Sequence, residues 1–408
     1  MSLIRALSDW PLLICGPILR RVTPDEVAVF IATKVPCDVQ LLVGPAGTHA
    51  GSWKSTPVRT RRLGNALHVT VSHLTIPAEP KLTPGVVYEY DVRMTRADTG
   101  VTETLDGQAG LLAGDDPLGY SAGALPAFAL PPTRFRLNLL HSSCRKPHGG
   151  GPDALVMADR LVARSRAAAT RADEAHQRPH NLLLTGDQIY ADDVALSMLS
   201  TLQESGALLC AQSPDESFPE RVLMTSAEVK PGRAREEFLR AKSALSSDKG
   251  MNHLMFFAEF CAMYVMCWSD ELWPRGAEGR PTVGFATFGP ELAEQNTKER
   301  KDLIDFVRTV RTVRRVMANV PTLMMFDDHE VSDDWNLDRS WYDDSLTNAV
   351  QHQVVRNGLL AFAVFQAWGN EPSRFHAGVP RDLLDLVTVP EEVAPRRSSD
   401  SRRVRMWR

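Results

Sequence analysis

Three clusters of polar residues, each directly after an apolar segment, contain the side chains of this chain that could do chemistry. They have the sequences SSCRK at residues 142–146, GDQIY at 186–190 and DDHE at 327–330. The third cluster places three acidic side chains within four positions beside a predicted core. That arrangement is costly unless a cation or a basic partner compensates for the charge. We therefore interpret this cluster as a metal-binding turn.

Taken singly, the other two clusters also have ordinary structural explanations. An acidic residue after a strand, such as Asp187, is often a helix cap or a turn former. A lone cysteine such as Cys144 is often a small buried hydrophobe. The agreement of three strand endings, rather than any one residue, is what favours a shared site.

The residue types in these clusters suit a dinuclear metal centre. A carboxylate can bridge two cations, and a thiolate with a phenolate suits a transition metal such as iron. Two cations about 3.5–4 Å apart can bind a phosphoryl group and activate water for in-line attack. In this interpretation Asp187 bridges the metals, Cys144 and Tyr190 hold one of them, and Asp328 holds the other. His329 would face the phosphate and supply a proton to the leaving oxygen.

The elements that must position these clusters alternate between strands and helices. Apolar segments at 135–140, 181–184 and 322–326 are the predicted strands. Helices are predicted over residues 153–175, 234–245, 253–268, 298–317 and 346–368. This alternation indicates an α/β layered fold with a largely parallel sheet, in which ligands bind at the carboxyl ends of the strands.

The N-terminal part has a different pattern. Short β-branched segments at 27–32, 39–43, 68–71 and 87–92 are separated by Pro, Gly and Asp turn signals. We predict a fibronectin-III-like antiparallel β-sandwich over residues 1–114, a linker over 115–133, and an α/β domain over 134–408.

Composition excludes several classes of protein. The content is 43% hydrophobic and 24% charged, as in a globular protein, and the net charge of -4 gives no support to nucleic-acid binding. No run of about 18 apolar residues predicts a membrane span. No convincing export signal is present, and six scattered cysteines do not form a disulfide framework, so we predict a cytoplasmic protein. The basic residues between 396 and 405 are interpreted as a solvated end.

The three clusters, in this order, resemble the PhoD-like branch of the calcineurin-like metallophosphatases. That branch has Ser-Cys at the first strand end, here at 143–144, then Gly-Asp-x-x-Tyr at 186–190 and Asp-Asp-His-Glu at 327–330. Gly-Pro at 16–17 and Arg-Val-Thr-Pro at 21–24 are similar to the start of its N-terminal sandwich.

The resemblance implies an alkaline phosphatase or phosphodiesterase that uses iron with calcium or another divalent ion. It implies that Cys144, Asp187 and Tyr190 are iron ligands, that Asp328 serves the second metal and that His329 is catalytic. Arg145 follows Cys144 in the first cluster and is a candidate phosphate contact. For Asp327, Glu330 and Asp334, which follow the same strand, the resemblance implies only that they lie near the site.

One departure from that family concerns the late metal-binding histidines. The histidines after His329 are His352, in a helical pattern, and His376, in a loop, and neither has the expected Gly-Asp-x-His context. We therefore expect a truncated or divergent member, with an α/β domain that is incomplete at its C-terminal end. An uncovered apolar sheet face would favour self-association or a missing C-terminal segment.

Two alternatives to the phosphoesterase follow from the same residues. A catalytically weak or silent homologue acting as a binding or assembly module would explain the absent histidines. A covalent hydrolase is less well supported, because there is no Gly-x-Ser-x-Gly elbow and Cys144 has no recognisable His-Asn partners.

Overall fold

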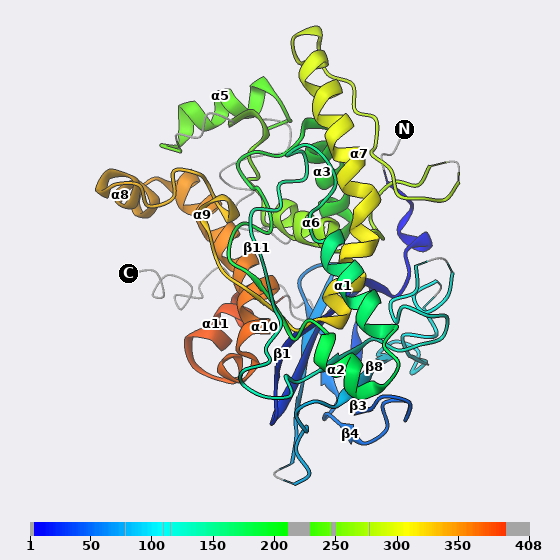
Figure 1. Cartoon of the computed structure of the whole chain (residues 1–408). Helices are drawn as coiled ribbons and strands as arrows, with labels where there is room; N and C mark the ends of the chain where they lie inside the picture. Colours follow the sequence, from blue (N-terminus) through cyan, green and yellow to red (C-terminus); the bar gives the residue numbers. More distant parts are fainter. Residues whose placement is uncertain are drawn as a thin grey trace.

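The computed structural model describes residues 4–77, 79–108, 110–114, 116–210, 229–245, 250–276 and 278–388. The fold is mixed α/β, with antiparallel sheets in the N-terminal part and a parallel sheet with helices after them. In Figure 1 the N-terminal strands gather at the bottom of the view and most of the helices lie above them. The predicted fold class is confirmed. The basic residues between 396 and 405 lie outside the described residues.

Two antiparallel sheets form the N-terminal part, with strand orders β1-β2-β7-β6 and β10-β8-β3-β4. Their strands are β1 (Leu13–Thr23), β2 (Glu26–Thr33), β3 (Cys37–Pro45), β4 (Trp53–Lys54), β5 (Val58–Arg59), β6 (Arg61–Arg62), β7 (His68–Thr75), β8 (Val87–Arg96), β9 (Thr102–Glu103) and β10 (Ala127–Ala129). Burial alternates along β8, so alternate residues such as Tyr90 and Val92 enter the core between the sheets. All four predicted N-terminal strands are present.

The segment predicted as a linker is partly a strand. Its residues 127–129 form β10, which pairs with β8 in antiparallel register, with Ala127 opposite Glu89. The Ala127 amide also donates to the Asn319 side chain at 2.9 Å. Backbone pairing with an exposed strand edge therefore overrides the turn-forming composition of this segment. The domain boundaries themselves remain a prediction.

The parallel sheet that carries the polar clusters has the order β11-β12-β13. Its strands are β11 (Leu139–Ser142), β12 (Asn181–Leu184) and β13 (Thr322–Met324). The predicted strand at 135–140 is thus displaced toward the C-terminus. The reason is the register: β12 begins at Asn181 opposite Leu139, so residues before 139 have no strand partner there. Phe135 is accordingly 83% exposed.

Helices surround this sheet. They are α1 (Val156–Arg166), α2 (Arg171–Gln177), α3 (Leu196–Cys210), α5 (Arg233–Lys242), α6 (Phe257–Trp268), α7 (Pro290–Asn319), α8 (Arg339–Thr347), α9 (Ala349–Phe362), α10 (Trp368–Asn370) and α11 (Gly378–Val387), with a π-helical turn at Ala363–Ala367. Short 3₁₀ turns lie at Leu7–Asp9, Gly250–Asn252, Asp328–Glu330 and Pro372–His376. None of the helices in the described ranges is long and apolar enough to cross a membrane.

The predicted helix at 153–175 is two helices, because the Thr170 side chain accepts a hydrogen bond from the Asp173 amide and starts α2 anew. The predicted helix at 346–368 is likewise interrupted at Asn348, which caps α9. The helix at 298–317 is longer than predicted and begins at Pro290, a residue favoured in the first turn.

A second hydrophobic core joins the β1-β2-β7 sheet to the parallel sheet and the helices, and it includes Phe30 of β2, Leu182 of β12 and Val310 of α7. Buried polar contacts cross the same boundary. Arg314 on α7 donates to the Gly16 carbonyl of β1 at 2.8 Å and pairs with Glu271 at 2.9 Å and Asp270 at 3.3 Å. The N-terminal strands are therefore fixed against the helices by packing and by buried hydrogen bonds.

We expect Arg314→Ala to lower the free energy of unfolding by about 3 kcal/mol, because it removes the fully buried cation from Asp270 and Glu271 and leaves them the more exposed Arg275. Equilibrium denaturation followed by circular dichroism would measure the loss. Arg308→Ala on the exposed face of α7, where the ion pair with Asp305 is 3.6 Å long, is the control and should change stability by less than about 0.5 kcal/mol. A similar effect of both substitutions would contradict the buried role of Arg314.

Candidate metal centre

The three polar clusters meet at the carboxyl ends of β11, β12 and β13. Two groups of potential metal ligands form there, and within each group the ligand atoms lie within 4.8 Å of one another. One group is Cys144, Asp187 and Asp327, and the other is Asp187, Asp328 and His329. Asp187 belongs to both groups, which is the arrangement that a bridging carboxylate requires.

Cys144 occupies an unusual backbone conformation that brings its thiol toward Asp187. Its φ is +52°, in the left-handed region that residues with a Cβ rarely adopt. The turn closes against Gly186, where an added Cβ would lie 2.6 Å from the Ser143 Cβ and 2.9 Å from the Cys144 Sγ. Glycine at 186 is therefore a packing requirement of the site, because it lets the first two clusters approach.

Asp187 is almost completely buried, with 1% of its surface exposed. Its Oδ1 has no hydrogen-bond partner among the residues that the structure describes. Burial raises the pKa of Asp187 to about 6, since it outweighs the favourable charge of His329, and the nearby Asp327 and Asp328 raise the pKa further. A buried carboxylate oxygen without a donor, surrounded by other acids, fits a position that a cation would occupy.

Tyr190 lies beside the ligand group that contains Cys144 and Asp187. Its side chain is largely buried and interacts with both the Cys144 thiol and the Asp187 carboxylate. Burial, together with the charge of Asp187, raises the pKa of the Tyr190 hydroxyl. The phenol ring stacks on the His329 imidazole, with ring centroids 4.4 Å apart. The hydroxyl of Tyr190 is therefore close to Cys144 and Asp187, and its raised pKa means that a phenolate there requires a bound cation.

His329 is oriented by Asp192, which is buried. The imidazole Nδ1 lies 2.7 Å from Asp192 Oδ1, and the other oxygen of that carboxylate accepts the Asp333 amide at 2.8 Å. Burial lowers the pKa of His329, but the hydrogen bond and the charge of Asp192, together with Asp187 and Asp328, raise it overall to about 9. The histidine is thus held in one orientation, with its Nε2 left for another partner.

Glu330 connects two of the clusters although its side chain is not in either ligand group. Its Oε1 accepts the Gln188 amide at 2.7 Å, and its Oε2 accepts the Asp327 amide at 2.8 Å. The Gln366 side chain donates to Oε1 at 2.8 Å. Burial raises the pKa of this carboxyl to about 8, with the charge of Asp187 adding to the effect of burial and the two backbone hydrogen bonds opposing it.

The structure brings together the predicted ligands Cys144, Asp187, Tyr190 and Asp328 with the predicted catalytic His329. Arg145, the predicted phosphate contact, makes contacts inside the protein. The Arg145 side chain is buried, and its guanidinium pairs with Asp153 at 2.8 Å and donates to the Cys267 carbonyl at 3.2 Å. Its Nη1 has no hydrogen-bond partner among the described residues, and the phosphate contact stays a prediction.

Three residues of the site had no role in the sequence prediction. Asp327 lies in the ligand group with Cys144, while Asp192 orients the histidine and Glu330 joins the turns. Asp327 could have been found from its position directly after a strand. The late histidines lie elsewhere: His352 Nδ1 lies 2.9 Å from the Ser345 carbonyl, and the His376 ring packs beside His73.

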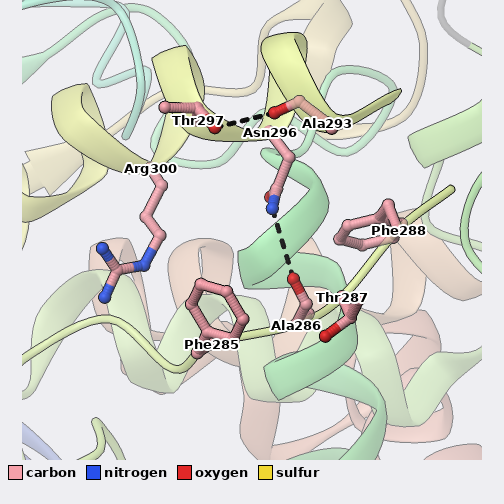
Figure 2. Close-up of a pocket in the computed structure, with 8 residues that line it drawn as sticks. All are labelled: Phe285, Ala286, Thr287, Phe288, Ala293, Asn296, Thr297 and Arg300. Atoms are coloured by element: carbon pink, nitrogen blue, oxygen red, sulfur yellow. Dashed lines mark hydrogen bonds between the residues drawn. The ribbon is translucent and has the colours of Figure 1, made fainter. Parts of the chain in front are cut away.

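Two hollows lie on either side of the N-terminal half of α7. The larger, of about 650 Å³, is next to the metal centre and is lined by Lys146 and Asp193 among others. The smaller, of about 230 Å³, lies between α7 and residues 285–288, where Asn296 donates to the Ala286 carbonyl at 3.2 Å (Figure 2). Neither hollow is lined by a metal-ligand candidate, but the larger one includes Lys146, whose Nζ lies 5.5 Å from the centre of the Tyr190 ring.

No family model and no curated protein matches the sequence. Among solved structures, one titled "Structure of PhoD" aligns with 10% sequence identity and a TM-score of 0.38. The alignment covers 92% of this chain and 48% of that one, so the chain spans about half the length of the structure that it matches.

Proposed function

We propose that this chain is a metal-dependent hydrolase of phosphoric esters, acting on monoesters or diesters through a dinuclear metal centre. One observation carries the proposal: two groups of acidic, thiol and imidazole ligands share Asp187, whose buried Oδ1 has no donor among the described residues. A phosphate would be repelled by these carboxylates alone, so the site supports this reaction only with cations bound.

The residues divide into two sets in this proposal. Cys144 and Tyr190 would hold an iron-like ion together with Asp187, and Asp328 would hold calcium or another divalent ion, with Asp327 as a further candidate ligand. When bound, the cations would polarise the phosphoryl oxygens and lower the pKa of water.

The protein itself supplies the proton. Asp192 holds the His329 ring by its Nδ1, so the Nε2 is the atom that can donate to a leaving oxygen. The stacked Tyr190 ring restricts the imidazole further. His329 is therefore the proposed general acid, and Asp192 is a positioning residue.

A second candidate function is a binding module without catalysis. It is favoured by the ligand groups themselves, which contain a single histidine within the described part of the chain. The exposed outer strand β11, with Leu139 47% exposed, would then be a surface on which another polypeptide could add.

Elemental analysis of the purified chain after loading with iron, calcium, zinc or manganese tests the proposal. We expect about two metal ions per chain, one of them iron, and hydrolysis of phenyl phosphate or bis(phenyl) phosphate that a chelator abolishes. A folded protein that takes up no metal and cleaves neither ester would refute the hydrolase, and the binding module would become the leading function.

A further inference from the structure

The larger hollow beside the metal centre is lined mainly by ionisable side chains. It lies between the turn after β11, the residues after Tyr190, the 3₁₀ turn at Gly250–Asn252 and α7, and has a volume of about 650 Å³. Its ionisable side chains are Lys146, His148, Asp193, Lys298, Glu299 and Asp302. The volume is in the range of small-molecule sites, but Met251 is the only large apolar residue among those that line it.

Lys146 lies between the hollow, which it lines, and the proposed metal ligand Tyr190. The Lys146 Nζ lies 5.5 Å from the centre of the Tyr190 ring and forms an ion pair with Asp193. Asp193 directly follows Asp192, the residue that holds His329. A group attached to a phosphate at the metal centre would therefore extend toward this wall of the hollow.

Several polar groups of the hollow are fixed in place by hydrogen bonds and ion pairs, and one buried nitrogen lacks a partner among the described residues. His148 has a side chain that is 8% exposed, and its Nε2 lies 3.4 Å from Asp193. Its Nδ1 has no hydrogen-bond partner among the described residues. Glu299 is held by the Leu196 amide at 2.8 Å and by Gln295 at 2.7 Å. The polar lining is thus preorganised by contacts within the protein.

The balance of charges restricts what the hollow can accept. A second phosphate would meet the carboxylates of Asp193, Glu299 and Asp302, and an apolar group would desolvate the charged lining without offering it a hydrogen bond. A neutral group with many hydroxyls can donate to the carboxylates and accept from the lysines at the same time. Resting on the proposed function, we infer that this hollow is the leaving-group subsite and that it selects phosphate esters of neutral, hydroxyl-rich alcohols of the sugar class.

The test compares glucose 6-phosphate with cyclohexylmethyl phosphate, which has the same ring size and the same primary ester position without the hydroxyls. For the metal-loaded chain we expect kcat/KM to favour the sugar ester by about tenfold or more. Asp302→Asn should reduce that preference by about tenfold, because it weakens a charge-assisted hydrogen bond to a hydroxyl. Asp305→Asn, one turn further along α7 and paired with Arg308, is the matched control and should leave the preference unchanged.

The kinetic results distinguish failure of the proposed subsite from failure of the proposed phosphoesterase activity. Cleavage of both esters with no sugar preference, or a preference that Asp302→Asn does not alter, would overturn the subsite and leave the phosphoesterase intact. If the metal-loaded protein cleaves neither these esters nor the phenyl esters, the proposed function itself fails. A preference for the sugar ester that falls only in the Asp302 variant would support the subsite.

Discussion

Asp187→Asn is expected to lose most of the bound metal and to lower the esterase kcat/KM at least about 100-fold. An amide has one acceptor oxygen and no charge, so it cannot bridge two cations. The amide nitrogen would also place two hydrogens toward one of the metal positions. The measurement is metal content per chain, followed by kcat/KM for phenyl phosphate.

The melting temperature of the metal-free Asp187→Asn protein distinguishes loss of metal binding from loss of folding. Burial raises the pKa of Asp187 to about 6, above its ordinary value of 3.8, so the ionised carboxylate destabilises the metal-free folded state. The folded protein therefore loses stability relative to the unfolded chain as the pH rises from about 4 to about 6, and asparagine escapes this penalty. At pH 8 the metal-free Asp187→Asn protein should melt no lower than the metal-free parent.

Asp98→Asn, an exposed change in the turn after β8, is the matched control and should keep both metal and activity. A variant Asp187→Asn with the metal content of the parent protein would show that this carboxylate is not a bridge. A variant that is metal-free because it is unfolded would show a lowered melting temperature, which the bridging role does not predict.

Glu330→Ala should destabilise the protein by about 3 kcal/mol, although its side chain is in neither ligand group. The substitution leaves the backbone amides of Gln188 and Asp327 and the side chain of Gln366 without their acceptor, inside the protein. Those amides belong to the turns that carry Asp187 and Asp328, so metal content should fall as well. Denaturation by urea and metal analysis under folding conditions measure the two effects.

Glu330→Gln gives an intermediate test of the same contacts. Its single carbonyl oxygen can still accept from one turn, but its NH₂ group would face an amide donor of the other, so we expect about half the loss seen with alanine. Glu371→Ala, where the side chain is exposed and pairs only with Arg374, is the control. Equal metal binding in Glu330→Ala and the parent protein would mean that the two turns keep their geometry without the buried carboxylate.

The sequence was sufficient to predict the main candidate residues because each follows an apolar strand at a short distance. β12 occurs at the predicted residues, and Asp187 and Tyr190 come directly after it. The fold class followed from the same alternation of segments. Local signals were enough here because the carboxyl ends of parallel strands bring their following residues to one edge.

The supporting residues could not be predicted, because their roles depend on contacts between distant segments. The hydrogen bond between Asp192 and His329 spans 137 positions, and that between Glu330 and Gln188 spans 142. No local pattern distinguishes either carboxylate from an ordinary turn residue. The helix α3 was missed for a different reason: it is buried on most of its surface, so its hydrophobic residues lack a clear helical period.

The left-handed backbone at Cys144 affects which substitutions are favourable at this position during evolution. A residue with a Cβ costs about 1–2 kcal/mol there, whereas glycine costs almost nothing. Without selection for metal binding, replacement of Cys144 by glycine would be a stabilising mutation that descendants could accept readily. The identity of the residue at this position in descendants of this chain therefore records whether natural selection has continued to act on the thiol.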